Sequence, residues 1–296
     1  MMQIKQNTPL QTLDVTNETE LLNFLIEKKI KKNRTVIKSL LTHKQVKVNN
    51  KVISLFNYQL KPGDIVTIYK STKKQDCRQL PGLKIVYEDD SLIIIDKEAG
   101  LLSIATDREK RETAYSIVSG YLKEGNPKIR IFVLHRLDRE TSGLMMFAKN
   151  ESIQEIMQKN WDSIVRTRSY IAVIEGMLSP ESGTIISWLT EDKNYVMHSS
   201  FTDNGGQKAV THYQTLKMNN RFSLIELDLE TGRKNQIRVH LQHVGHPVVG
   251  DKKYGSRISL IKRIALHAHE LVFIHPVTNG TLRFKSPIPG KMKSLV

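Results

Sequence analysis

The sequence contains one cysteine, Cys77, among 296 residues, so it can form no internal disulfide and no cysteine-rich zinc site. No apolar run approaches the ~20 residues that a membrane-spanning helix needs. The opening stretch, MMQIKQNTPL, lacks the apolar segment of a signal peptide. These absences argue against disulfide-rich, membrane-spanning and exported proteins. We therefore expect a globular protein of the reducing cytoplasm, with neither a membrane partner nor an obligate protein partner.

Acidic residues are also few. The chain has 30 Asp and Glu against 45 Lys and Arg, which gives a formal net charge of +15 and a pI of about 9.7. Such an excess favours a polyanionic partner, either a nucleic acid or an anionic membrane surface, although a merely soluble basic protein stays open as the alternative. Residues 1–82 hold fifteen basic and six acidic residues, or +9 of the total. The uneven charge predicts a separate basic module.

The length allows two domains, and the pattern of the first 70 residues favours a small module of its own. A helix start at Asn17 to Glu20 precedes the apolar-periodic run LLNFLIEKKI, and a second helix is expected from Arg34. The run QVKVNNKVI alternates about an Asn49-Asn50 turn, and KPGDIVTIY reads as a turn and a closing strand. We expect residues 1–70 to form two short helices followed by a small β element.

The basic residues of this module gather around the junction of the two expected helices: Lys28, Lys29, Lys31, Lys32, Arg34 and Lys38. Such a cluster is either a solvated face or a surface that follows RNA phosphates, and the scarcity of interspersed carboxylates favours the second. The runs RTVIKSLLTHKQVKVNNKVI and LKPGDIVTI resemble the αL-type RNA-binding module that a small-subunit ribosomal protein also carries. The resemblance covers about fifty residues and implies an RNA-binding role.

Residues 71–83 are polar and basic and include Pro-Gly, so we expect a linker there and a second domain over 84–296. Strand-like runs dominate this domain, with helices expected around 113–122, 151–160 and 234–244. The runs show no regular βαβ alternation. The sequence therefore predicts an α+β fold whose mixed, largely antiparallel sheet has helices beside it.

The run HRLDRETSGL, residues 135–144, crowds charged side chains between two strand-like segments, so we expect a loop. Cations flank Asp138 on both sides, which favours its ionised form. An ionised carboxylate held in place can act as a nucleophile or a base. This stretch alone favours the plainer explanation, a carboxylate that only caps a turn or pairs with an arginine.

A second unusual stretch, LDLETGRKNQIRVHL at 227–241, reads as a strand, a turn at Thr231-Gly232 and a helix. The nearby histidines His240, His243 and His246 could suggest a metal site. No acidic or sulfur ligand accompanies them, and the turn after the helix breaks the needed geometry, so we predict no metal site.

Taken together, these stretches resemble the RluA-type family of pseudouridine synthases, which isomerise chosen uridines in RNA. HRLDRETSGL is similar to the central motif of the family, and TGRKNQIRVHL with GDKKYG is similar to a later one. IIIDKEAGLLS at 93–103 resembles the segment that opens the catalytic domain, and RTRSYIAVIEG at 166–176 resembles its tyrosine-bearing strand. The resemblance covers about 84–290, and it implies an isomerase that needs no cofactor.

The resemblance also implies residue roles. Asp138 would be the essential carboxylate, which either bonds to the substrate or abstracts a proton. Arg136 would enter the space vacated by the target uridine, Tyr170 would stack on the uracil, and Arg238 would pair with Asp138. The other members of the charged loop, His135 and Arg139, are expected to bind RNA.

The sequence departs from the family pattern at Glu98, often proline, at Asn235, often histidine, and at Arg168, often lysine. These differences concern turn geometry and RNA contacts more than Asp138. Two other functions remain in view: a noncatalytic RNA-binding or ribosome-assembly protein, and an N-glycosidase that would release free uracil. We expect large-subunit ribosomal RNA as the substrate, with transfer RNA as the alternative.

Overall fold

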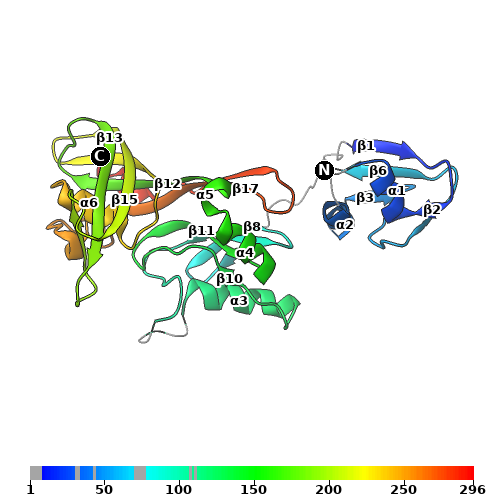
Figure 1. The fold of residues 1–296 in the computed structure, drawn as a ribbon, viewed down its shortest axis with the longest axis horizontal. Coiled ribbons are helices and arrows are strands. Elements are labelled where there is room, and N and C mark those ends of the chain that lie inside the picture. The colour runs from blue at the N-terminus through cyan, green and yellow to red at the C-terminus, as the bar shows by residue number, and fades with distance from the viewer. Residues whose placement is uncertain (1–8, 31–33, 43–44, 70–77, 107–108, 110–111) are drawn as a thin grey trace, which may run out of the picture. The chain divides into compact units, whose positions relative to one another are not determined.

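The computed structural model describes residues 9–30, 34–42, 45–69, 78–106, 109 and 112–296. The chain divides into two compact units, residues 1–76 and 77–296 (Figure 1). Within the expected linker, residues 71–77 lie outside the described part, whereas Gln79–Leu80 form strand β7 and pair with β8. The second half of that expected linker therefore belongs to the larger unit.

The smaller unit contains two helices and two small sheets. One sheet has the order β1-β6-β3-β4, and the other is the pair β2-β5. The apolar faces of both helices pack onto the first sheet through Leu21, Leu25, Ile37, Leu41 and Val66. The elements are β1 (Pro9–Asp14), β2 (Thr19–Glu20), α1 (Leu21–Glu27), α2 (Arg34–Thr42), β3 (Val46–Val48), β4 (Lys51–Val52), β5 (Gln59–Leu60) and β6 (Ile65–Tyr69).

Two local expectations for this unit have different outcomes. The Asn49-Asn50 turn is confirmed: both residues have positive φ, and the Asn49 side chain donates to Asp64 at 2.7 Å. The helix start at Asn17 is wrong. Helix α1 begins at Leu21 because Thr19–Glu20 pair with Gln59–Leu60 as strands, which carries the chain extended as far as Glu20.

The larger unit is built on a 12-stranded sheet, which confirms the expected α+β class. Its strand order is β14-β13-β15-β16-β12-β17-β11-β9-β8-β7, with β10 beside β11 and β18 beside β17. Among the described strands only β11 and β17 pair in parallel, so the sheet is mixed and largely antiparallel, as expected. The strands are β7 (Gln79–Leu80), β8 (Leu83–Glu88), β9 (Leu92–Lys97), β10 (Phe132–Val133), β11 (Ser142–Ala148), β12 (Val165–Glu175), β13 (Ser182–Glu191), β14 (Met197–Ser200), β15 (Gln207–Met218), β16 (Phe222–Leu229), β17 (Leu266–Ile274) and β18 (Thr281–Lys285).

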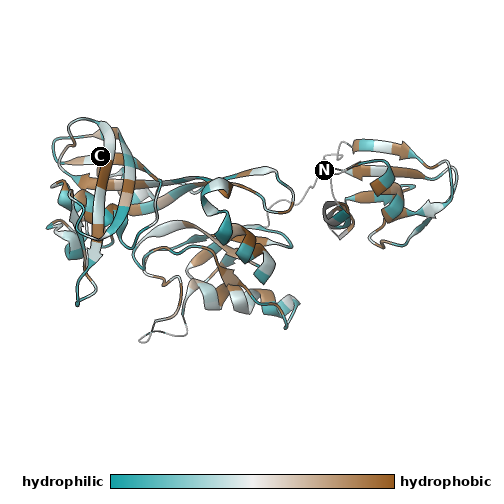
Figure 2. Ribbon diagram, viewed as in Figure 1, coloured by the Kyte–Doolittle hydropathy of each residue, from teal (hydrophilic) through white to brown (hydrophobic). Residues whose placement is uncertain are grey.

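Helices cover both faces of the sheet around β9 and β11, so these strands are apolar along nearly their whole length. Alternate residues of β9 point to opposite faces: Ile95 packs in the cluster of Val118 on α3, whereas Ile94 packs in the cluster of Met157 on α4. Figure 2 shows hydrophobic residues along the ribbon of α3. The three helices expected from the sequence are present. They are α3 (Ala114–Gly125), α4 (Glu151–Lys159) and α6 (Gln236–His243), and the short helices are α5 (Trp161–Ile164), the 3-10 turn Lys252–Tyr254 and α7 (Gly290–Lys293).

Of the strand-like segment expected just before the charged loop, Phe132–Val133 form strand β10. The following residues, from Leu134 onward, form the loop that carries the charged motif. No helix in the described part of the chain is long and apolar enough to cross a membrane.

Candidate active site

Two motifs that lie far apart in the sequence meet beside strand β12. The loop between β10 and β11 carries Asp138, and helix α6 carries Arg238. Arg238 Nη1 donates to Asp138 Oδ2 at 3.1 Å, and the Asp138 side chain stays 27% exposed. A small pocket of about 70 Å³ opens here, lined by Asp138, Tyr170 and Arg238 among others. The structure thus brings together the three residues to which the resemblance assigns catalysis.

Backbone hydrogen bonds hold the Asp138 loop from both sides. Ser103 Oγ donates to the Leu137 carbonyl at 2.6 Å and accepts from the Leu137 N–H at 3.1 Å. The buried Lys97 ammonium donates to the carbonyls of Leu101 at 2.7 Å and Arg139 at 3.2 Å. These bonds tie the turn after β9 to the residues on either side of Asp138, so the carboxylate sits on a restrained backbone.

Gly143 explains why the loop can run directly into β11. Its φ is +112°, and a Cβ at this position would lie 2.1 Å from the carbonyl oxygen of Ala268 on β17. No residue with a side chain fits such an approach. The glycine of the charged motif therefore lets β11 and β17 pair in parallel just beyond Asp138.

Arg238 binds a second carboxylate, that of Asp251, more closely than it binds Asp138. Its Nε donates to Asp251 Oδ2 at 2.6 Å and its Nη2 donates to Asp251 Oδ1 at 2.8 Å. Burial disfavours the charge of Arg238, but the bonds and charges of Asp251 and Asp138 outweigh it and raise the arginine's pKa above its usual value. The two-pronged geometry therefore belongs to the pair with Asp251, and Asp138 receives one bond from a guanidinium already held in place.

Asn235 completes this network just before α6. Its Oδ1 accepts from Arg238 Nη1 at 3.0 Å, and its Nδ2 donates to the Tyr254 hydroxyl at 3.0 Å. Its φ of 54° lies in the left-handed region, which asparagine tolerates better than most residues. The Tyr254 ring in turn lies under the guanidinium of Arg238, at 4.8 Å from its centroid. The arginine that faces Asp138 is thus held on three sides.

Tyr170 lies on β12 and lines the same pocket as Asp138. Burial raises the pKa of its phenol, and the charge of Asp138 acts in the same direction against the opposing effect of Arg168. The ring therefore stays neutral and available for stacking at physiological pH.

His135 contributes no positive charge to the loop. Its Nε2 accepts a hydrogen bond from the Met146 N–H at 3.1 Å, and burial lowers the pKa of the imidazole to about 3. The ring lies against Trp161, with centroids 5.8 Å apart. Its ring also lines the cleft beside the Asp138 pocket.

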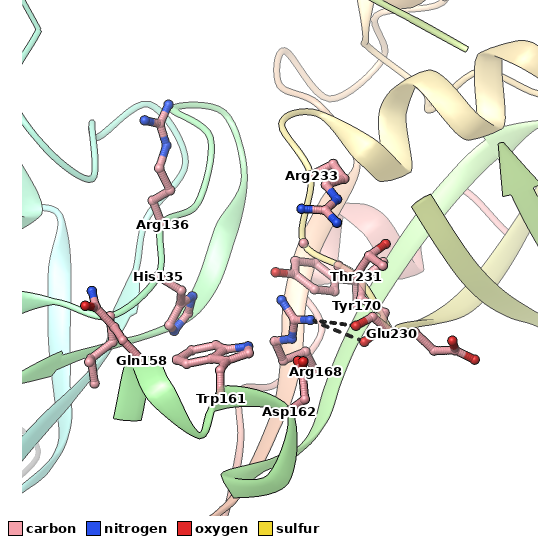
Figure 3. Close-up of a pocket in the computed structure, with 13 residues that line it drawn as sticks. His135, Arg136, Gln158, Trp161, Asp162, Arg168, Tyr170, Glu230, Thr231 and Arg233 are labelled. Atoms are coloured by element: carbon pink, nitrogen blue, oxygen red, sulfur yellow. Dashed lines mark hydrogen bonds between the residues drawn. The ribbon is translucent and has the colours of Figure 1, made fainter. Parts of the chain in front are cut away.

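The two arginines of the loop have different surroundings. Arg139 Nε donates to the Gly100 carbonyl at 3.0 Å, and the side chain stays 66% exposed. Arg136 is exposed and lines both the Asp138 pocket and a larger adjoining cleft. Figure 3 shows Arg136 on the loop that faces the turn carrying Arg233 across the opening. Of these two, Arg136 is the one that lines the Asp138 pocket.

The basic residues expected to bind RNA in the smaller unit are only partly described. Lys31 and Lys32 lie outside the described residues. Lys28, Lys29, Arg34 and Lys38 are exposed around the end of α1 and along α2. The Lys28 and Lys38 ammonium groups lie over the rings of Phe24 and Phe56, at 5.6 and 5.4 Å from their centroids. The described members thus share an exposed region of the two helices.

The three histidines weighed as metal ligands have separate partners. His240 bonds Ser187 at 2.8 Å and Thr211 at 3.0 Å, and His246 Nδ1 bonds the Glu175 carbonyl at 2.9 Å. His243 packs edge-on against a phenylalanine ring. No group of three or more His, Cys, Asp or Glu residues in the described part of the chain could hold a metal ion.

Sequence reasoning assigned no role to several residues that build the site: Ser103, Lys97, Asp251 and Tyr254. Asp251 and Tyr254 lie in the GDKKYG run, which was singled out as a motif, so a signal for them was present. Ser103 and Lys97 act through backbone carbonyls and a backbone N–H, and sequence patterns give little sign of such contacts.

Comparisons with known proteins point to one family. A family model described as RNA pseudouridylate synthase matches residues 91–243. An uncharacterized RNA pseudouridine synthase, YhcT, of Bacillus subtilis (strain 168) is 34% identical over 270 residues, which cover 90% of this chain and 89% of that protein. The ribosomal large subunit pseudouridine synthase D of Neisseria meningitidis serogroup B is 35% identical over 226 residues, which cover 72% of this chain and 60% of that protein.

A solved structure agrees at the level of the fold. The human RNA pseudouridylate synthase domain containing 4 superposes with a TM-score of 0.59 at 24% identity, covering 71% of this chain and 90% of that one.

Proposed function

The chain belongs to the RNA pseudouridylate synthase family, in its RluA-type branch, and is an isomerase that acts on RNA; from this premise we propose that it converts uridines of large-subunit ribosomal RNA to pseudouridine through the Asp138 carboxylate. The family resemblance of the sequence is thereby confirmed. The choice of RNA and the role of the aspartate are the new parts of the proposal.

The reaction requires a carboxylate and a pocket that holds the uridine. The bond between uracil N1 and ribose C1′ breaks, the base turns, and C5 bonds to C1′. The C5 proton leaves and N1 gains a proton, so the atoms balance without a cofactor. A carboxylate can start this sequence by attacking the sugar or by removing a proton from it.

One observation carries the assignment of Asp138. Its Oδ2 accepts from Arg238 Nη1 at 3.1 Å, whereas its other carboxylate oxygen accepts no hydrogen bond from any described residue. A partly exposed carboxylate that lines a pocket, with one oxygen not engaged by any described residue, can react with a ligand. A carboxylate that only capped a turn would instead direct its oxygens to backbone N–H groups.

The neighbouring residues supply the other tasks. Tyr170 would stack on the displaced uracil, an interaction worth roughly 1–3 kcal/mol. The exposed Arg136 would occupy the space that the uridine leaves, which would offset part of the few kcal/mol that unstacking costs. The unit of residues 1–70 would add phosphate contacts and affinity.

Two features favour ribosomal RNA of the large subunit as the substrate. One is the similarity to a protein named ribosomal large subunit pseudouridine synthase D. The other is the αL-type pattern of the N-terminal residues, which resembles a module that a small-subunit ribosomal protein also carries. We also propose a cytoplasmic location, because the single cysteine, Cys77, suits a reducing compartment.

A tritium-release assay tests the proposal. Large-subunit ribosomal RNA and transfer RNA would each be transcribed with uridine tritiated at C5, because only bonding of C5 to C1′ releases that label. We expect release from the ribosomal transcript and little from transfer RNA. Release from transfer RNA alone would show that transfer RNA, and not ribosomal RNA, is the substrate. RNA binding without release would indicate an assembly protein. Free uracil would indicate a glycosidase.

A further inference from the structure

A cleft of about 530 Å³ lies beside the Asp138 pocket and is continuous with it, because Arg136, Tyr170 and Arg233 line both. We propose that this cleft binds the nucleotide next to the target uridine, with its base on the ring of Trp161 and its phosphate among the surrounding arginines. The inference rests on the proposed function. An RNA strand is continuous, so a nucleotide adjoining the target must leave the Asp138 pocket through a neighbouring opening, and the cleft is such an opening.

Trp161 supplies the aromatic surface. It begins α5, is partly buried, and packs on the cluster of Ile153 and Met157 with the rest of its ring toward the cleft (Figure 3). The Arg168 guanidinium lies 5.7 Å from the ring centroid. The guanidinium thus lies over the ring as a cation–π neighbour, but farther away than the about 3.5–4.0 Å at which stacked atoms touch, so it is not in close contact with the ring.

The indole N–H of Trp161 is a hydrogen-bond donor at the cleft. No described residue accepts a hydrogen bond from it, although buried or partly buried tryptophans usually find such a partner. A base edge or a ribose oxygen of a bound nucleotide would satisfy this donor.

The cleft also carries the cations that a phosphate requires. Arg136, Arg168 and Arg233 line it against the carboxylates of Asp162 and Glu230, so positive charge is in excess. Arg233 uses its Nε for the Lys208 carbonyl at 3.1 Å. Within the described part of the chain, Arg168 donates only two hydrogen bonds, both long at 3.5 Å and both to backbone carbonyls. Both guanidinium groups therefore keep donors for a phosphate, whose geometry their forks match.

Gly232 keeps room for this arrangement. A Cβ there would lie 2.6 Å from Arg168 Nη1, so a side chain would displace the guanidinium from its place beside the indole. The turn of the TGRKNQIRVHL motif thus shapes the cleft as well as leading into α6.

Intrinsic fluorescence tests the stacking directly, because the chain has two tryptophans, Trp161 and Trp188. Trp188 lies on β13 and is not among the residues that line the cleft. In Trp188→Phe, the remaining indole reports on the cleft. We expect its fluorescence to be quenched when an RNA stem-loop with a single loop uridine is added. The matched variant Trp161→Phe, which keeps only Trp188, should show little quenching.

Abasic substitution identifies the base. Two further stem-loops would each lack the base on one side of the uridine. We expect one of them to lose the quenching and the other to retain it. Equal quenching by both abasic RNAs, or none by the intact RNA under conditions where it binds, would overturn the proposal.

Affinity measurements give an independent check. Trp161→Ala should weaken binding of the intact stem-loop by about 5- to 150-fold, since stacking of one base contributes that range. It should have no such effect on the abasic RNA that lost the quenching, and Trp161→Phe should retain most of the affinity. An equal loss on all RNAs would assign Trp161 to the core alone. Neither readout needs turnover, so quenching without tritium release would refute the proposed reaction and leave the nucleotide site standing.

Discussion

Arg238 joins two carboxylates of different character, Asp138 and Asp251. It holds the nearly wholly buried Asp251 with two short bonds of 2.6 and 2.8 Å and reaches the partly exposed Asp138 with one bond of 3.1 Å. Asp251 therefore positions the arginine, and the arginine donates one hydrogen bond to Asp138. The inner pair is structural, and the outer carboxylate is free to meet a ligand.

Replacement of Asp138 by asparagine should abolish turnover with little effect on the fold. The amide keeps the size of the carboxylate but has no charge for attack or proton removal, so we expect tritium release to fall by at least ~10³-fold. Arg238 would still be neutralised by Asp251. We therefore expect RNA affinity to persist and the melting temperature to change by only a few degrees. A folded Asp138→Asn protein with near-normal turnover would show that Asp138 is structural.

Asp251→Asn, in contrast, should destabilise the fold. It leaves the buried guanidinium of Arg238 without its main counter-charge, a change that costs about 3–5 kcal/mol in the free energy of unfolding. Arg238→Lys should also lose stability and activity, because lysine cannot form the fork on Asp251. Urea unfolding compared with single-turnover rates separates the variants. If Asp251→Asn were as stable as Asp138→Asn, the assignment of the inner pair would be wrong.

The pairing of Asp138 with Arg238 shows what the sequence could predict about the site. The two residues are 100 positions apart, and nothing in their spacing brings them together. The motif resemblance did so, because it relates each residue to a family site. It could not predict that the arginine's fork points to Asp251, since this depends on how the turn after α6 folds back against the helix.

The fold was predictable where one apolar pattern dominates a segment. Helices α3, α4 and α6 and the apolar strands β9 and β11 are examples. Strand β17, LHAHELVFI, was not recognised, and its buried His267 pairs with Ser142 at 2.8 Å. Strand β13, SGTIISWLTE, was likewise not recognised, and its buried Ser187 forms a hydrogen bond with His240. Polar residues that satisfy one another across distant strands disrupt the apolar periodicity on which such predictions depend.

Buried histidines should make the larger unit sensitive to mild acid. Burial lowers the pKa of His240 and His267 to about 4, whereas an unfolded histidine titrates near ~6.5. Between these values the unfolded chain binds protons that the folded chain does not, so the free energy of unfolding falls as pH falls through this window. Each histidine contributes up to about 3 kcal/mol. Urea unfolding at pH 7 and pH 4.5 would measure the loss.

A variant comparison isolates the histidine effect, because Asp96, whose pKa burial raises, acts in the opposite direction. His240→Gln keeps an amide beside Ser187 and Thr211 but cannot take up a proton, so its stability should depend less on pH. Identical pH dependence in the wild type and His240→Gln would contradict the prediction.

Deletion of residues 1–76 should leave a folded isomerase with weaker RNA binding. The larger unit begins at Cys77 and has its own core, and the cut spares β7. The loss of phosphate contacts should make the plot of log Kd against log salt concentration shallower. The measurement is a salt titration of RNA binding by both proteins. An unchanged slope would remove the reason for assigning RNA binding to the smaller unit.

Asn235 should act as a positioning residue for the reaction. Asn235→Gly removes the bonds to Arg238 Nη1 and Tyr254 but keeps a backbone that accepts the φ of 54°. Arg238 would keep its fork on Asp251, while the nitrogen that faces Asp138 would be less well held. The loss of one bond to a charged group, about 1.5–3 kcal/mol, should lower kcat by roughly 10- to 150-fold and leave KM near its wild-type value.

Asn235→Ala is the matched variant for Asn235→Gly. It loses the same two hydrogen bonds but adds backbone strain of about 1–2 kcal/mol, because alanine disfavours the left-handed region. The two variants should therefore share the same kcat and differ in the free energy of unfolding. If Asn235 had a purely structural role, activity would follow stability. The more stable Asn235→Gly would then have a higher kcat than Asn235→Ala. If Asn235→Gly turned over at the wild-type rate, the hydrogen bond from Arg238 to Asn235 would have no part in aligning the arginine with Asp138.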